Sequence, residues 1–159
     1  LPLSWTGGSI SGAWTIATNG VLNLSGVAVK QLYYGTITNG GTIVWTDPGA
    51  WNFEARNSGT STRLVNLPGS LLDIRTDASL TTGGSSGGKE IVNGGTVRKS
   101  AGNGTTAMAA ALHNIGTVEV QAGTLALAGS HNLTGGTLNV GLRSPVNFGQ
   151  ISFSGAASL

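Results

Sequence analysis

Hydrophobic and polar residues alternate in many short segments of this chain. Val118 and Val120 flank Glu119, for example, and the same alternation recurs in residues 21–24, 72–74, 125–127, 138–140 and 151–153. A period of two places the aliphatic side chains on one face of a β-strand. Strands this short cannot bury a face alone, so we expect successive strands to stack and share one interior.

A short phrase recurs before these strands: Asn, a spacer, Gly, and then Thr or an apolar residue. The copies begin at Asn39, Asn57, Asn93 and Asn114, with weaker copies at residues 19–21 and 134–137. Their spacing is close to 20 residues, except for a step of 36 from Asn57 to Asn93 that we interpret as two turns, with Asn66 between them. The repeat predicts an all-β, right-handed parallel β-helix (β-solenoid) of about seven rungs of roughly 20 residues.

The recurring Asn has two interpretations. Gly supplies positive φ angles at turns, and Asn tolerates the left-handed region or bonds to the turn backbone. Asn side chains at the same phase of successive coils would instead stack as an amide ladder. The sequence leaves both readings open.

Two segments depart from the repeat. Residues 81–89, rich in Gly and Ser, and residues 99–106 both predict loops. The repeat resumes after each, so we interpret residues 1–159 as a single solenoid segment. Neither end carries a capping pattern, and we expect the chain to be a fragment of a longer repeat protein.

The phrases Gly-Thr-aliphatic and Gly-Gly-Thr-Leu, as in residues 114–127 and 135–140, resemble the repeats of secreted bacterial surface proteins, among them autotransporter-like adhesins. This resemblance covers most of the chain. It implies a β-helical architecture and an extracellular or bacterial cell-surface location. The family has no shared catalytic motif, so the resemblance assigns no catalytic residue.

Composition excludes several functions. Charged residues make up 9% of the chain, the net charge is +2, and no basic stripe is present, so nucleic-acid binding is not expected. The absence of Cys removes thiolate metal sites and thiol catalysis. No apolar run has the length of a membrane span, so we expect no membrane insertion within this segment.

Two catalytic motifs occur in the Gly/Ser-rich segment. Gly83–Lys89 matches the start of a phosphate-binding loop, but Glu90 stands where Ser or Thr should hold magnesium. Ser85 lies in a formal G-x-S-x-G, but a nucleophile elbow needs a buried strand before it and a helix after it. We interpret both matches as coincidences.

Five other polar residues are the remaining candidates for chemistry. Asp73, Arg75 and Asp77 alternate, so a continuous strand would place all three on one exposed face, where carboxylates can serve acid–base catalysis or cation binding. A solvated ion pair is the favoured interpretation. His113 and His131 are isolated in loop-like sequence, which favours surface residues over zinc ligands.

Aromatic residues concentrate in the first third of the chain, at Trp5, Trp14, Tyr33, Tyr34, Trp45, Trp51 and Phe53. Trp14 and Tyr34 are 20 residues apart, so they could stack on successive rungs. Burial in a wide coil is favoured, and exposure would create a platform for sugar stacking.

The sequence therefore predicts an extracellular structural or adhesive β-solenoid, a rigid rod or filament with no catalytic, metal or cofactor-binding residues. Its expected partners are further copies stacked end to end and surface glycans. The alternative is a carbohydrate-binding or polysaccharide-degrading β-helix with a groove lined by Asp73, Arg75 and Asp77 or by exposed Trp side chains.

Overall fold

The computed structural model describes residues 2–144 and 147–159, and all regular structure in these residues is β-strand. One sheet of seven strands, the first face, contains β1 (Leu3–Trp5), β3 (Val21–Leu24), β5 (Thr42–Trp45), β8 (Leu71–Ile74), β11 (Thr96–Lys99), β14 (Thr117–Val120) and β17 (Thr137–Val140). A second, 13-stranded sheet forms the other two faces.

In this second sheet, β2 (Gly8–Ile16) and β4 (Lys30–Asn39) run across both faces. The second face continues with β6 (Trp51–Ala55), β9 (Leu80–Gly84), β12 (Thr105–Met108), β15 (Gly123–Leu127) and β19 (Asn147–Phe153), beside which lies β18 (Leu142–Ser144). The third face continues with β7 (Ser61–Asn66), β10 (Gly88–Asn93), β13 (Ala111–Asn114), β16 (His131–Asn132) and β20 (Ala157–Ser158).

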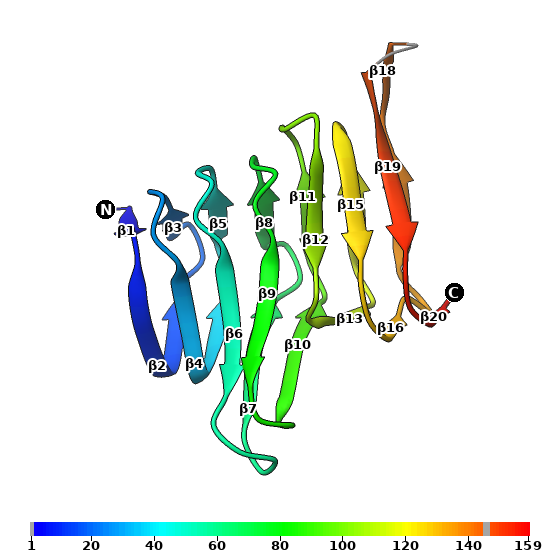
Figure 1. Ribbon diagram of the computed structural model, residues 1–159. Coiled ribbons are helices and arrows are strands. Elements are labelled where there is room, and N and C mark those ends of the chain that lie inside the picture. The colour runs from blue at the N-terminus through cyan, green and yellow to red at the C-terminus, as the bar shows by residue number, and fades with distance from the viewer. Residues whose placement is uncertain (1, 145–146) are drawn as a thin grey trace.

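The chain is a parallel β-solenoid of about seven turns, as the repeat predicts. Each strand pairs in parallel with the strands one coil before and after it, and the two ends of the chain lie at opposite ends of the stack (Figure 1). Among the described residues, only β18 and β19 pair antiparallel.

Residues one coil apart share rows, which confirms the predicted common interior. Val118 lies in register with Leu138, and both belong to a row on the first face that runs through Leu3, Leu22, Ile43, Leu72, Val97, Val118 and Leu138. Leu24 and Val120 belong to the parallel row two residues later. Both rows point into one core.

The coil length averages about 23 residues rather than 20 because the middle coils are extended. Only two residues separate Tyr33 from Thr36 in β4, whereas eight residues separate their partners Glu54 and Arg63. The additional residues form a ledge, residues 55–61 and 84–88, and the connection between β6 and β7 extends beyond the neighbouring coils (Figure 1).

The expected loop at residues 81–89 is wrong in most of its length. Residues Leu80–Gly84 form β9 and pair with β6, and β10 begins at Gly88, which leaves a turn only at residues 85–87. Parallel pairing with the coil below overrides the weak strand preference of Gly and Ser. At residues 99–106 the expected connection is present, between the end of β11 at Lys99 and the start of β12 at Thr105.

The amide ladder is present. Asn39, Asn66, Asn93 and Asn114 are buried at the end of the third face, and each Nδ2 donates to the Oδ1 of the next, at 2.8, 2.8 and 2.6 Å in order. The first three Nδ2 groups also donate to a backbone carbonyl in the next coil at 3.0–3.1 Å. These bonds satisfy amides that would otherwise be costly to bury.

Two asparagines of the recurring phrase, Asn57 and Asn19, do not occupy the ladder position that the repeat predicts for them. Asn57 lies in the exposed ledge, where its Oδ1 accepts from the backbone N–H of Gly59, so the step of 36 residues does not consist of two turns. Asn19 is exposed with a φ of 67°, and Ile16 takes the ladder position of its coil. Asn57 and Asn19 are the local turn residues of the other interpretation.

The Gly of the recurring phrase is required by close stacking of the turns. A Cβ at Gly116 would lie 2.2 Å from the carbonyl oxygen of Gly95, and a Cβ at Gly95 would lie 2.4 Å from that of Ser70. The two turns therefore approach more closely than any side chain allows. This contact explains why Asn and Gly recur together.

Most of the aromatic residues fill the core of the first coils, as expected. Trp51 makes edge-to-face contacts with Trp5, Trp45 and Phe53, at centroid distances of 5.2–6.5 Å. Trp14 does not stack on Tyr34, because the register of β2 with β4 places Trp14 beside Ile37, while Tyr34 lies at a bulge between the partners of Ser11 and Gly12. Trp14 is 45% exposed and Tyr34 36% exposed.

Candidate functional site

Asp73 belongs to a buried ion cluster and not to an exposed catalytic face. Its side chain is fully covered, and its two oxygens accept from Nε of Arg75 at 2.7 Å and Nε of Arg98 at 3.2 Å. Burial raises the pKa of Asp73, but hydrogen bonds from Arg98, Ser100 and Arg75 outweigh it and hold the pKa below its ordinary value. A carboxylate held in this way is a poor general acid or base near neutral pH.

Asp77 lies outside the strand that carries Asp73, because β8 ends at Ile74. Its Oδ1 accepts from Nζ of Lys99 at 2.8 Å, and its Oδ2 accepts from the backbone N–H of Gly104 at 3.0 Å. The expectation that Asp73, Arg75 and Asp77 share one exposed face is therefore wrong. The two carboxylates belong to separate ion clusters.

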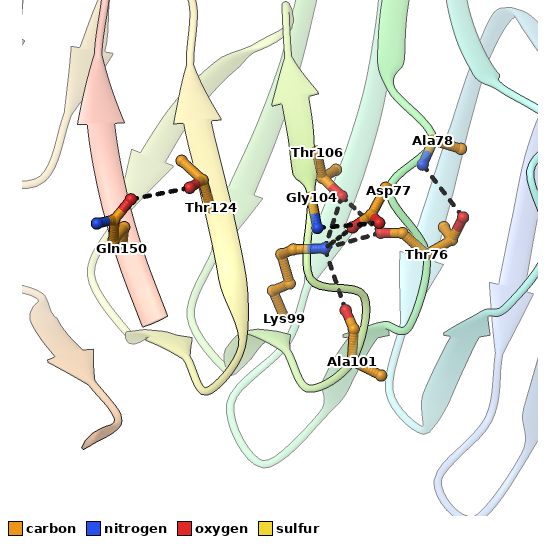
Figure 2. A network of polar contacts seen from close by, with 9 residues as sticks. All are labelled: Thr76, Asp77, Ala78, Lys99, Ala101, Gly104, Thr106, Thr124 and Gln150. Carbon is orange, nitrogen blue, oxygen red and sulfur yellow. Dashed lines mark hydrogen bonds and ion pairs between the residues drawn. The ribbon is translucent and has the colours of Figure 1, made fainter. Parts of the chain in front are cut away.

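Lys99 is a buried cation for which the sequence gives no signal. It occupies an inward row between Ile74 and Val120, and its Nζ also donates to the carbonyls of Thr76 and Ala101 and to Oγ1 of Thr106 (Figure 2). Four oxygens therefore replace the water that a buried ammonium loses. The group fixes the corner between the first and second faces.

An earlier corner carries a related arrangement. Nζ of the buried Lys30 donates to the carbonyl of Gly26 at 2.6 Å, and Oδ2 of Asp47 accepts from the backbone N–H of the same Gly26 at 2.6 Å. Burial lowers the pKa of Lys30, an effect that the charge of Asp47 partly opposes. The only sequence signal for these corners is the pair Thr-Asp, at residues 46–47 and 76–77.

The two histidines lie in strands and not in loops. His113 is in β13 and makes a contact of 3.2 Å from Nε2 to Oε2 of Glu90 on the outer surface. His131 is buried in β16, where Nδ1 accepts from the backbone N–H of Leu112 at 3.1 Å. Burial, with a smaller contribution from His113, lowers the pKa of His131. No cluster of metal-ligating side chains occurs among the residues that the structure describes.

The Gly83–Lys89 segment has neither the geometry of a phosphate-binding loop nor that of a nucleophile elbow. It comprises the end of β9, the turn at residues 85–87 and the start of β10, so a strand and not a helix follows the turn. Ser85 donates its backbone N–H to the carbonyl of Ala55, and Glu90 forms an ion pair with Arg63. The segment supports the ledge.

The N-terminal end of the stack has an apolar mouth, a cavity of about 230 Å³. Its walls come from β1, β2 and their neighbours, and include Leu3, Trp5, Ile10, Trp14, Ile16 and Ile37. These side chains occupy inward rows of the first coils, so the mouth is an open end of the solenoid interior.

The outer surface of the second face carries a cluster of polar and aromatic residues beside the ledge. Tyr33 and Tyr34 make an edge-to-face contact at 4.7 Å, and the Arg56 guanidinium lies over the Tyr34 ring at 5.6 Å. The carboxylate of Glu54 accepts hydrogen bonds from the side-chain amides of Gln31 and Asn52. The sequence placed Tyr33 and Tyr34 among the aromatic residues but gave no signal for their contact with the ledge.

Comparison with protein-family models, with curated proteins and with solved structures returned no match for this chain. The described residues include no helix with the length and hydropathy needed to cross a bilayer.

Proposed function

We propose that this chain is an extracellular structural or adhesive β-solenoid that displays its outer faces from a rigid rod and catalyses no reaction. The observation that supports the proposal best is the continuous interior. The amide ladder spans four coils, and the buried Asp73 and Lys99 clusters bind successive coils to one another. Charged groups in these positions stabilise the scaffold.

The outward rows suit contact with other molecules. On the first face, Thr42, Thr96, Thr117 and Thr137 belong to one row, in which Leu71 lies between Thr42 and Thr96. The second face carries Thr105, Thr124 and Gln150 in another row. Thr124 donates to Gln150 across coils at 3.2 Å (Figure 2). Neutral hydroxyl and amide groups on a flat sheet favour adhesion to polar surfaces. The phrases that resemble repeats of secreted bacterial proteins support a bacterial cell-surface location.

Display of the chain on a heterologous bacterial surface tests this function. We expect increased adhesion to protein-coated or glycan-coated surfaces, compared with cells that display an unrelated domain of the same size. The same cells should release no product from a panel of polysaccharides. Release of reducing or unsaturated sugars, or adhesion equal to that of the control cells, would contradict the proposal.

We also propose that copies associate end to end. Leu3 and Trp5 begin the inward rows of the first face, and Leu138 and Val140 end the same rows, all but Trp5 substantially exposed. A second copy placed on the apolar mouth would continue both rows, in the head-to-tail geometry that generates filaments. Sedimentation velocity should show oligomers that grow with concentration and weaken in Val140→Lys. A monomer at all concentrations would reject this association.

Carbohydrate binding is the second candidate function, and the cluster around Tyr33 and Tyr34 favours it. Aromatic rings beside carboxylate and amide groups offer both a stacking surface and hydrogen-bond partners for sugar hydroxyls. The polysaccharide-degrading version lacks comparable support, since Asp73 is covered by two arginines.

A further inference from the structure

A row of polar side chains crosses four successive coils on the second face. Ser9, Gln31, Asn52 and Thr81 occupy equivalent positions of β2, β4, β6 and β9. Ser9 donates to Gln31, and Oγ1 of Thr81 donates to Oδ1 of Asn52 at 3.0 Å. These hydrogen bonds fix the orientation of the row before any ligand arrives.

Glu54 joins this row to the aromatic pair. Gln31 and Asn52 both donate to its Oε2, and Tyr33 is its partner in the neighbouring strand. Among the described residues, both hydrogen bonds to the carboxylate end at Oε2, so Oε1 is available to accept from a hydroxyl group. Charge-assisted hydrogen bonds of this kind are stronger than neutral ones.

Tyr34 holds an unusual backbone conformation at this place. Its φ is 36°, in the left-handed region that side chains other than Gly, Asn and Asp rarely adopt. Gly35 follows it, yet the strained position carries a tyrosine whose ring is fixed by Tyr33 and Arg56. Strained residues cluster at functional sites, because the surrounding structure maintains them for a purpose other than stability.

Gly83 keeps the surface open beside the carboxylate. A Cβ there would be in ordinary contact with Asn52, at 3.6 Å, and with Oε2 of Glu54, at 3.8 Å. Gly83 has no positive φ in this structure, so the position accepts a side chain without backbone strain. Any larger residue would cover the acceptor groups.

We propose that this surface binds a linear neutral oligosaccharide whose axis runs along the stack. The surface is made of Ser9, Gln31, Tyr33, Tyr34, Asn52, Glu54, Arg56 and Thr81. Parallel strands are spaced about 4.8 Å apart, which is close to the length of one pyranose unit in a linear glycan. One sugar therefore faces each coil. Tyr33 and Tyr34 contact the ring carbons, and the amides and Glu54 hydrogen-bond the hydroxyls. The inference gives a location and a ligand class to the carbohydrate-binding function proposed above and is independent of the rod.

The test uses the 159-residue chain and sets of linear neutral oligosaccharides of increasing length, first on an array and then by calorimetry with the best binder. We expect affinity to rise with each added sugar up to the four coils of the row. Tyr34→Gly should reduce affinity about ten-fold or more through loss of the stacking ring, although Gly suits the backbone there and the fold should persist. Tyr34→Phe should retain most of the affinity.

Gly83→Leu is the second variant, because it blocks the acceptors while Tyr34 stays in place. Thr38→Ala, in the part of β4 that lies on the third face, is the matched control and should bind as the unmodified chain does. Circular dichroism and the thermal midpoint verify that each variant is folded. Binding that survives both Tyr34→Gly and Gly83→Leu would reject this site but leave carbohydrate binding intact. Failure of every saccharide to bind the unmodified chain would reject both this site and the carbohydrate-binding function.

Discussion

Nδ2 of Asn66 donates to Oδ1 of Asn93 at 2.8 Å, although the two residues are 27 positions apart in the chain. The same geometry connects Asn39 to Asn66 and Asn93 to Asn114, so one coil length of sequence corresponds to one hydrogen bond along the interior. An amide in the middle of this ladder has bonds on both sides, which makes its removal a direct test of coil stacking.

Replacement of Asn66 by Ala should destabilise the fold by about 3 kcal/mol, because the donor of Asn39 and the acceptor of Asn93 both lose a buried partner. Urea-induced unfolding followed by circular dichroism measures the change. Asn57→Ala is the matched control, since Asn57 begins the same sequence phrase but lies in the exposed ledge, and it should change stability by less than about 0.5 kcal/mol. Equal effects of the two substitutions would mean that the ladder does not form.

Lys99→Met should cost about 2 kcal/mol, because it retains the length of the side chain but leaves Oδ1 of Asp77 and the carbonyl of Ala101 without their donor. Lys89→Met serves as the control, because Lys89, near the start of β10, is only partly buried. Adding Asp77→Asn to Lys99→Met should cost less than the sum of the two single changes, as expected for residues in contact. Additive effects would show that the ion pair contributes nothing.

Gly116→Ala should be strongly destabilising, by about 2 kcal/mol or more, because the new Cβ would collide with the carbonyl oxygen of Gly95 in the coil below. Gly59→Ala is a substitution of the same size in the ledge, where the nearest atom would lie 3.5 Å away, and it should be tolerated. Thermal unfolding of the two variants side by side measures the difference. A stable Gly116→Ala variant would contradict the close stacking of the turns.

Stability should fall as the pH drops below about 6.5, the ordinary pKa of histidine. The folded state lowers the pKa of His131, so between the two pKa values the unfolded chain binds the extra proton and is favoured as pH falls. Above both values the His131 contribution is constant. The lowered pKa of Asp73 affects the stability of the fold only near and below pH 4, where stability is lost as the carboxyl takes up a proton.

The urea midpoint at several pH values measures this dependence, and His131→Gln should flatten it below about pH 6.5. His113, the other titratable group that influences His131, is exposed, so His113→Gln should leave most of the slope in place. An unchanged slope in His131→Gln would show that another group is responsible.

The sequence predicted the solenoid because its evidence is local and repeated: alternation around Glu119 and Asn139, and a phrase that returns at near-constant intervals. It misplaced the coil boundary at Asn57 because the phrase also fits an exposed turn, and only Asn66 has partners in both neighbouring coils. The spacing of the copies cannot distinguish an exposed turn from a buried ladder position. Only the hydrogen bonds to the neighbouring coils distinguish them.

The buried charged groups were not predictable for a different reason. A lysine in a strand normally faces solvent, and nothing near Lys99 in the sequence shows that the carbonyls of Thr76 and Ala101 converge on it. Asp73 likewise meets Arg98 only because the coil returns after 25 residues. The contact of Arg56 with Tyr34 depends on the length of the ledge, which varies from coil to coil.

The distance between residues on one outward row tests the winding of the chain most directly. Asn23 and Asn139 lie on the same row of the first face, five strand spacings apart. Spin labels at these two positions, measured by double electron–electron resonance, should give a single narrow distance near 24 Å, from about 4.8 Å per spacing. A label pair at Asn23 and Glu119 should be shorter by one spacing. Broad distributions, or a shorter distance for the Asn23–Asn139 pair, would show that the chain does not wind as a solenoid.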